Sequence, residues 1–500
     1  MSIRVYNTLT QKKEPFETLE PGKVGIYLCG PTVYKPSHIG HAVGPIIFDV
    51  IKRYLVHKGY DVKLVVNITD VDDKLIEEAE AQNTTVPALA ERITHSYLDS
   101  MARLGIDTFD EMPKASEHIG DIVRLIQGLI ANDAAYVSGA DVYFDVTHDD
   151  DYGKLSNRKQ DDQTAQRDVA GEQKRNPGDF ALWKGCKPHE PAEVRYASPW
   201  GEGRPGWHIE CSAMSMRYLG ESFDIHGGGM DLIFPHHENE IAQAECATGK
   251  TFAKYWFHHG LTRFNTKKVS KSDAAMQDAM KKMTLATLID TYGGELLRYF
   301  VISTHYRRPI EFSDAEIESK RKGLSNFHRL FERVERLAGR TPYVDPRDKT
   351  DHWAAAPKAA FEAFAHDVDR CVEQFFAAMD DDFNTAAATA ACYEFCTRIN
   401  RFVEEQKLET ADDDDANETA YAAARRLMDL GRLQGLFMAP PQSKTAGDAT
   451  VDKLMTVLID ARSRAKKAKQ FDIADAIRNG LTDAGITLED RPDGTQWRID

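Results

Sequence analysis

The sequence lacks the features that mark membrane, secreted and disulfide-stabilised proteins. None of its 500 residues belongs to an uninterrupted apolar run of the about 18–20 residues that a membrane-spanning helix needs. The first seven residues contain no apolar signal core. Cysteine is scarce, with seven residues and no short repeating spacing, which argues against a disulfide framework and favours a reducing compartment. We therefore expect a cytoplasmic protein without a membrane partner.

The chain also lacks an excess of positive charge. Its formal net charge is −16, which argues against a protein that binds nucleic acid over its whole surface. A local basic face on an acidic body stays open, because one predicted helix near the C-terminus carries Arg462, Arg464, Lys466, Lys467 and Lys469. The 42% hydrophobic and 28% charged residues are typical of a globular protein, and the length predicts two to four domains.

The segment 29–41, CGPTVYKPSHIGH, lies between a predicted strand and a predicted helix. Alternating apolar residues precede it, and apolar residues at helical spacing follow it. Ligands of open parallel sheets bind at the carboxyl ends of strands, where a helix N-terminus offers N–H groups to phosphate. Gly40 would let a flat ring approach the backbone, and His38 and His41 can each donate a hydrogen bond to an anion. A helix start with two surface histidines is the alternative interpretation.

The rest of the chain predicts a split α/β domain followed by helices. A second buried strand at 60–67 completes a strand–helix–strand unit that fits a right-handed parallel crossover. After a polar insertion, the run from Phe223 predicts a strand that ends at Ile225, with glycines 227–229 forming a turn. Helical periodicity dominates from 285 to 436, and a segment rich in proline and small residues then leads to a small C-terminal unit.

Four separated residues form a candidate metal site at the edge of the predicted sheet. They are Cys29, Cys211, His236 and Glu240. His236 and Glu240 are four residues apart on a predicted helix and therefore share one face. Two thiolates, an imidazole and a carboxylate suit zinc, although the spacing is not that of a zinc finger. Buried cysteines packed as small hydrophobic residues remain the alternative.

A polar loop offers positive charge for phosphate. Lys268 and Lys271 flank Ser270, and their ammonium groups could neutralise a triphosphate during attack on its α-phosphorus. A solvated loop is the alternative for this short motif alone. This loop and the pair of His38 and His41 would together provide both parts of a nucleotide-activating site.

These motifs resemble those of a known enzyme family. His-Ile-Gly-His at 38–41 and Lys-Val-Ser-Lys-Ser at 268–272 resemble the two signatures of class I aminoacyl-tRNA synthetases. Similarity to the cysteinyl-tRNA synthetases in particular lies in segments 29–34, 175–177, 180–184, 206–214, 226–229, 234–240 and 379–385. It covers nearly the whole chain. Two departures are Val269 in place of the usual Met and an unusual continuation at 273–282, which leaves the length and closure of this loop open.

The resemblance implies a Rossmann-like parallel-sheet catalytic domain that is split by an insertion and followed by a helical bundle. We expect the first half of this domain at 1–114, the insertion at 115–200, the second half at 201–262, a signature loop and stem-contact region at 263–320, the bundle at 321–440 and an anticodon-binding domain at 448–500.

The resemblance also implies roles for the candidate residues. Cys29, Cys211, His236 and Glu240 would hold one zinc ion per chain, which would select the thiolate of L-cysteine. Zinc accepts thiolate more readily than the hydroxyl of serine, whereas a hydrophobic pocket would separate the two by only ~10–100-fold. Thr69 and Trp207 would contact the bound cysteine. No editing domain is evident.

For the nucleotide, the resemblance implies ATP with Mg²⁺ and two reaction steps. His38, His41, Lys268 and Lys271 would stabilise charge while the cysteine carboxylate attacks the α-phosphorus; the tRNA then attacks the adenylate. The implied ATP contacts are Gly40, Gly228, Gly229, Asp231 and Lys271. Phe471 and Trp497 would stack on unpaired tRNA bases, although either could belong to the core.

Two other functions are open at this point. A ligase that joins activated cysteine to an amino sugar in mycothiol synthesis would share the zinc and ATP chemistry but lacks the C-terminal unit at 451–500. A non-catalytic RNA-binding paralogue would not need the intact histidines, lysines and metal ligands. We expect a monomeric cysteine–tRNA ligase whose partners are ATP, L-cysteine and the cysteine tRNA.

Overall fold

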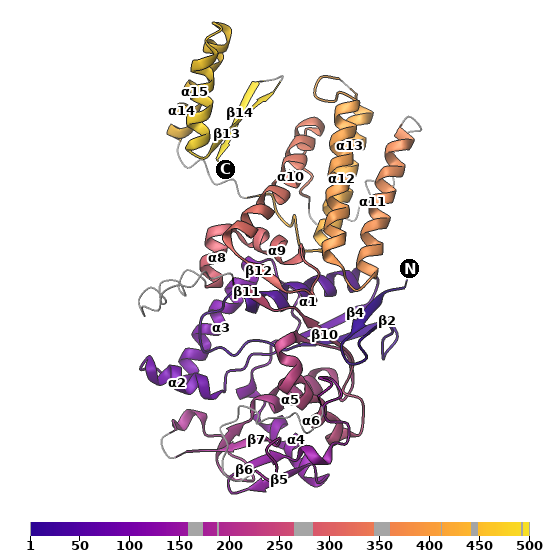
Figure 1. Ribbon diagram of the computed structural model, residues 1–500, viewed down its shortest axis with the longest axis vertical. Helices are drawn as coiled ribbons and strands as arrows, with labels where there is room; N and C mark the ends of the chain where they lie inside the picture. Colours follow the sequence, from indigo (N-terminus) through magenta and orange to yellow (C-terminus); the bar gives the residue numbers. More distant parts are fainter. Residues whose placement is uncertain are drawn as a thin grey trace.

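The computed structural model describes residues 2–158, 174–187, 190–264, 284–344, 361–411, 413–441, 449–491 and 494–499. A central parallel sheet lies in the middle of the molecule (Figure 1). Its order is β10-β9-β3-β4, formed by β3 (Lys23–Leu28), β4 (Asp61–Val66), β9 (Phe223–Gly229) and β10 (Ala253–His259). All neighbouring strands pair in parallel, so their carboxyl ends meet at one edge.

Helix α1 (Gly40–His57) is the crossover between β3 and β4. Its apolar residues recur at helical spacing, and Ile46, Val50 and Tyr54 are fully buried. Toward their carboxyl ends the strands are largely buried on both faces, as expected for a sheet that helices cover on both sides. This arrangement confirms the predicted α/β class with a parallel sheet.

The segment between β4 and β9 adds helices and a second sheet. Its helices are α2 (Asp73–Ala81), α3 (Val86–Arg103) and α4 (Ile119–Ala131). The second sheet is antiparallel and comprises β5 (Ala135–Ser138), β6 (Asp141–Phe144), β7 (Phe180–Gly185) and β8 (Gly203–Pro205). A separate apolar core joins α4 to this sheet through Ile126, Phe144 and Phe180. It lies below the parallel sheet in Figure 1.

Two helices return the chain to the parallel sheet. They are α5 (Trp207–Leu219), which precedes β9, and α6 (Glu238–Thr248), which precedes β10. Two short strand pairs lie outside these sheets: β1 (Arg4–Asn7) with β2 (Lys12–Pro15), and β11 (Thr262–Phe264) with β12 (Ile310–Phe312).

The described residues after 284 are mostly helical, as the periodicity predicts. They form α8 (Leu285–Tyr292), α9 (Gly294–Ile302), α10 (Asp314–Ala338), α11 (Glu362–Asp380), α12 (Thr385–Glu405) and α13 (Asp414–Leu433). A small unit follows, with α14 (Ala449–Lys467), α15 (Phe471–Asp483) and the hairpin β13 (Ile486–Arg491)–β14 (Gly494–Ile499). The exact domain boundaries stay predictions. None of the described helices has the length and apolarity to cross a bilayer.

The glycines of β9 correct one sequence-based expectation. The strand does not end at Ile225 but continues through Gly229, and Gly227 to Gly229 pair with β10. A Cβ atom at Gly227 would lie 1.9 Å from the ring of Phe48, and one at Gly228 would lie 2.6 Å from that of His237. These glycines therefore permit close packing rather than a turn.

One buried arginine joins α1 to the helical region. Arg298 of α9 is fully buried and forms an ion pair with Asp49 of α1. Its guanidinium also donates to the carbonyl of Leu104 at 3.0 Å and to that of Gln434 at 2.9 Å. Burial lowers the pKa of Arg298 to about 9, so the guanidinium stays charged at neutral pH.

Replacing Arg298 by Met should lower the free energy of unfolding by about 3 kcal/mol or more, because buried carbonyl groups and a carboxylate lose a charged donor. Denaturant titration followed by tryptophan fluorescence measures this change. The matched control is Arg321→Met, which breaks a surface pair with Glu318 at 2.8 Å and should cost no more than about 1 kcal/mol. Equal effects of the two substitutions would contradict the assigned role of Arg298.

Candidate functional site

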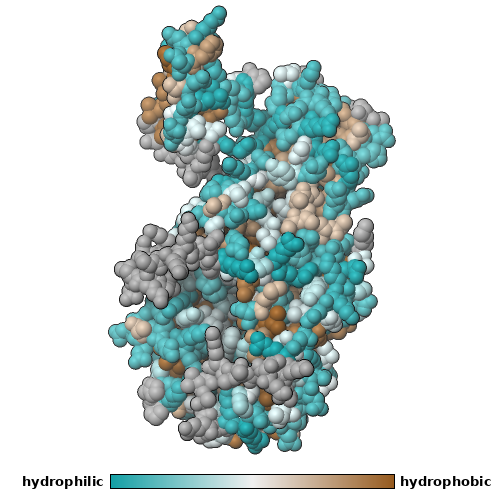
Figure 2. Space-filling model, viewed as in Figure 1, coloured by the Kyte–Doolittle hydropathy of each residue, from teal (hydrophilic) through white to brown (hydrophobic). Residues whose placement is uncertain are grey.

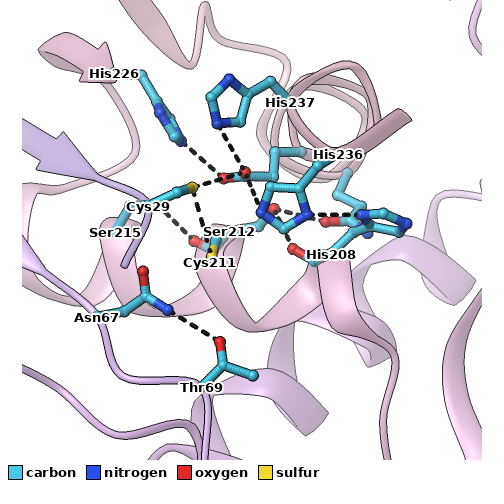
Figure 3. Close-up of polar contacts among 12 residues, drawn as sticks. Cys29, Asn67, Thr69, His208, Cys211, Ser212, Ser215, His226, His236 and His237 are labelled. Carbon is cyan, nitrogen blue, oxygen red and sulfur yellow. Dashed lines mark hydrogen bonds and ion pairs between the residues drawn. The ribbon is translucent and has the colours of Figure 1, made fainter. Parts of the chain in front are cut away.

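The four predicted metal ligands lie together at the carboxyl edge of the parallel sheet. Cys29 directly follows β3, Cys211 belongs to α5, and Glu240 belongs to the first turn of α6. Cys29 Sγ is 3.8 Å from Cys211 Sγ and 3.5 Å from Glu240 Oε1, and His236 Nε2 is 3.1 Å from the same oxygen. The four ligand atoms all lie within 4.8 Å of one another (Figure 3).

The surroundings of these residues suit a divalent cation. Burial raises the pKa of the Cys29 thiol well above its usual value, with a further contribution from Cys211. Burial also lowers the pKa of His236 to about 3, so its imidazole is neutral and can act as a ligand. A bound cation favours the thiolate forms and would offset the negative charge that this site then collects. Two sulfur donors, one nitrogen and one carboxylate fit zinc.

Two further histidines hold these ligands in place. His208 Nδ1 lies 2.8 Å from His236 Nδ1, which leaves His236 Nε2 directed at Glu240. His226 Nε2 lies 2.8 Å from Glu240 Oε2. This bond occupies the carboxylate oxygen that is turned away from Cys29 and His236. Such contacts fix the orientation of metal ligands and tune their basicity.

The structure also contains an overlapping set of donors that sequence reasoning missed. Cys29, His226, His237 and Glu240 offer ligand atoms within the same 4.8 Å limit. His237 Nδ1 already lies 2.8 Å from His258 Nε2, and burial lowers the pKa of His237 well below its usual value. This second set has one sulfur instead of two. The softer set with Cys211 is therefore the better match for zinc.

The predicted cysteine contacts lie close to this cluster. The indole of Trp207 stacks on the imidazole of His236, with ring centroids 4.3 Å apart. Its side chain is 37% exposed, so it is a wall of the site rather than part of the core. Thr69 is buried after β4, and its hydroxyl accepts a hydrogen bond from Asn67 Nδ2 at 3.2 Å (Figure 3).

The histidine pair lies at the start of α1. The rings of His38 and His41 stack, with centroids 4.0 Å apart. The backbone N–H of Gly40 donates to His38 Nδ1 at 3.1 Å, and that of His38 donates to His41 Nδ1 at 3.3 Å. Because both Nδ1 atoms accept hydrogen bonds, the neutral rings carry their protons on Nε2. Gly40 lacks a side chain where the ring of His38 packs, since a Cβ atom there would lie 2.8 Å from it.

Of the other predicted nucleotide contacts, three belong to the described residues and two do not. Gly228 and Gly229 end β9, and exposed Asp231 lies in the short helical turn Met230–Leu232 that follows it. A Cβ atom at Gly229 would clash with the carboxylate of Asp231. Lys268 and Lys271 lie outside the described residues, so their predicted contact with ATP stays a prediction.

The two predicted tRNA-stacking residues differ in their surroundings. Phe471 is 60% exposed at the start of α15, and Figure 2 shows apolar side chains on the surface of this C-terminal unit. Trp497 packs against the small core that contains Met455 and Leu488. Phe471 is therefore available for stacking, whereas Trp497 contributes to the fold of the unit.

Comparison with known proteins identifies the family. Residues 15–322 match the model of the class I (C) tRNA synthetase catalytic domain. The chain is 45% identical to the cysteine–tRNA ligase of Syntrophotalea carbinolica and 43% identical to that of Geobacter sulfurreducens, in each case over 100% of both chains. The chain belongs to the cysteine–tRNA ligase family.

Two other family models match later segments of this cysteine–tRNA ligase family member. Residues 374–438 match a DALR domain, and residues 451–498 match the cysteinyl-tRNA ligase anticodon binding domain. Among solved structures, a methionyl-tRNA synthetase of Mycobacterium tuberculosis in complex with methionyl-adenylate has a TM-score of 0.60 at 14% identity. It covers 87% of this chain and 94% of its own. That similarity concerns the fold alone and agrees with the predicted architecture.

The two overlapping donor sets can be separated by substitution. His236→Ala should remove the bound metal, because it deletes a ligand of the set with two cysteines. His226→Ala should retain a stoichiometric ion with weaker affinity, because it deletes a partner of Glu240. Metal content after dialysis against zinc, measured by atomic emission, distinguishes the two. The reverse pattern would assign the ion to the set with His226 and His237.

The environment of His41 predicts a pH dependence of stability. Burial, with a smaller contribution from His38, lowers the pKa of His41 from 6.5 to about 4. The unfolded chain therefore takes up this proton at higher pH than the folded protein does, and the free energy of unfolding should fall as the pH drops from 6.5 towards 4. His41→Gln should reduce this loss. Urea titrations at pH 8, 6 and 4.5 provide the measurement, and an unchanged slope in the variant would contradict the prediction.

Proposed function

We propose that this chain activates L-cysteine with ATP and transfers it to the cysteine tRNA. The observation that carries the proposal is the cluster of two thiols, an imidazole and a carboxylate, one of whose thiols, Cys29, lies on the connection that leads from β3 into α1. It occurs in a chain that is 41–45% identical to cysteine–tRNA ligases over their full length. The family membership accounts for the use of ATP, an amino acid and tRNA.

Zinc is the proposed ion, one per chain, held by Cys29, Cys211, His236 and Glu240. When bound, it supplies a position that accepts a thiolate sulfur and disfavours a hydroxyl oxygen. The protein residues contribute the shape of the site. Trp207 closes one side of it through its stacking on His236, and Thr69 offers a buried hydroxyl. Serine would thus be rejected by more than the ~10–100-fold that a hydrophobic pocket provides.

The proposed chemistry needs no protein nucleophile. The carboxylate of L-cysteine attacks the α-phosphorus of ATP, which is bound with Mg²⁺, and pyrophosphate leaves. The Nε2–H groups of His38 and His41 donate to the phosphate oxygens as negative charge develops, with Lys268 and Lys271 as the predicted cationic partners. A ribose hydroxyl of the tRNA then attacks the carbonyl carbon of the adenylate and releases AMP. Gly228, Gly229 and Asp231 are the proposed adenine and ribose contacts.

The C-terminal unit supports this function over the mycothiol-type ligase. The match of residues 451–498 to an anticodon binding domain is the feature that distinguishes the two. Basic side chains at the end of α14, namely Arg464, Lys466 and Lys467, can contact phosphates, and exposed Phe471 can stack on an unpaired base. The cytoplasm is the proposed location, because the ATP and tRNA that the reaction consumes are present there. The monomeric state stays a prediction.

The decisive experiment is ATP–pyrophosphate exchange followed by tRNA charging. Exchange should require L-cysteine, should be at least about 100-fold weaker with serine, and should disappear after zinc is removed by a chelator and return when zinc is restored. Cys29→Ala should abolish exchange, whereas Cys246→Ala, which changes a thiol on α6 outside both donor sets, should not. Exchange that is equal for serine, or charging of an amino sugar instead of tRNA, would refute the proposal.

A further inference from the structure

His259 is the last residue of β10, at the carboxyl edge of the parallel sheet, and it pairs with Gly229 of β9. Side chains alternate between the two faces of a strand. The neighbouring His258 faces the segment before α6, since its Nε2 atom lies 2.8 Å from His237 Nδ1. His259 faces α1 instead, because its Nε2 atom would lie 3.1 Å from a Cβ atom placed on Gly44. The imidazole of His259 therefore packs beside the first turns of α1.

This imidazole has one occupied nitrogen and one open nitrogen. Nδ1 lies 3.1 Å from the carbonyl oxygen of Gly260, which can only accept, so the proton of the neutral ring is on Nδ1. Burial lowers the pKa of His259 below its usual value, which keeps the ring neutral at pH 7. Nε2 is thus an acceptor. It has no hydrogen-bond partner among the described residues and is not fully enclosed by protein atoms.

The carboxylate of Asp231 faces the same space. Asp231 is exposed in the short turn that follows β9. A Cβ atom placed on Gly229 would clash with Asp231 Oδ1 and would lie 3.5 Å from Cε1 of His259. The missing side chain of Gly229 thus leaves an opening between the imidazole and the carboxylate. In the part of the chain that the structure describes, no side chain forms a hydrogen bond or an ion pair with Asp231.

Two acceptors at one opening select a ligand group with two donors. A vicinal diol meets this requirement, because its hydroxyls lie on neighbouring carbon atoms and each can donate to a different acceptor. The ammonium group of L-cysteine also carries several donors, but the proposed amino-acid contact Thr69 follows β4. Strands β9 and β3 lie between β4 and β10 in the sheet. Among the proposed substrates, the ribose of ATP is the group that fits this opening.

We propose that His259 Nε2 accepts a hydrogen bond from one ribose hydroxyl of ATP while Asp231 accepts from the other. This inference rests on the proposed function, and it adds His259 to the proposed ribose contacts. His259 is then a specificity-determining residue, which favours ATP over nucleotides that lack one of the two hydroxyls. A neutral acceptor suits this position because it adds no negative charge beside a triphosphate.

The test compares ATP with 2′-deoxy-ATP and 3′-deoxy-ATP. Isothermal titration of the full-length protein in the presence of Mg²⁺ gives the three affinities. His259→Leu should weaken the binding of ATP on the order of 10-fold, because one hydroxyl loses its acceptor. The deoxy analogue that lacks this hydroxyl should bind the wild type and the variant within about 3-fold of each other. An equal loss for all three nucleotides, or no loss for any of them, would overturn the inference.

Three more variants guard against a purely structural effect. His259→Gln offers an amide oxygen as acceptor and should recover part of the affinity for ATP. Asp231→Asn should lose its effect with the other deoxy analogue, because the two residues face different hydroxyls. His57→Leu changes an imidazole at the far end of α1, which stacks on Phe376, and it should leave the ratios of the three affinities unchanged. Equal losses in His259→Leu and His259→Gln would support a structural role and contradict the inference.

The remaining outcomes separate this inference from its alternatives. An effect of His259→Leu that persists with both deoxy analogues but disappears with purine riboside triphosphate, which lacks the 6-amino group, would assign His259 to the base and overturn the ribose contact. A ribose of the tRNA as the true ligand would leave ATP binding unchanged in His259→Leu, which also overturns the inference. If the wild-type protein does not bind ATP at all, the proposed function fails. If it binds ATP and His259→Leu keeps the full discrimination against both deoxy analogues, only the role of His259 is refuted.

Discussion

The carboxylate of Glu240 is the contact on which the site depends. It is fully buried, and its Oε1 atom lies close to both Cys29 and His236 while Oε2 bonds to His226. These partners come from the end of β3, from β9 and from the segment before α6. One side chain therefore connects the end of β3 with two segments that lie some two hundred residues further along the chain. A buried carboxylate is stable only when such partners surround it. The contacts that stabilise Glu240 are therefore the same contacts that bring the donor atoms together.

The parallel sheet explains why this contact forms where it does. Because β3 and β9 are adjacent and parallel, residues at their carboxyl ends lie side by side. The glycines of β9 let Phe48 and His237 pack directly on the strand, which brings the helices on either face close to the sheet. The histidine pair belongs to the same edge, at the start of the helix that follows Cys29. The proposed thiol-selecting site and the proposed phosphate-binding site can thus share one ligand.

The sequence was sufficient to predict the fold class, the family and the cluster of Cys29, Cys211, His236 and Glu240, because these depend on periodicity and on motifs in a fixed order. It could not predict the contacts of His208 and His226, which face the cluster only after α5 and β9 pack together. The glycines of β9 were misinterpreted as a turn because glycine serves both turns and close approaches, and only the position of Phe48 separates the two.

The contacts of Arg298 have a mechanical consequence. Its guanidinium binds α1 through Asp49, the end of α3 through Leu104 and the end of α13 through Gln434. Helix α1 is a single rod that begins beside His41 and ends where His57 stacks on Phe376 of α11. A displacement of the helical bundle relative to α1 would break the buried Arg298–Asp49 ion pair and the stacking of His57 on Phe376, so we expect the bundle and the helix that begins beside His41 to move as one body.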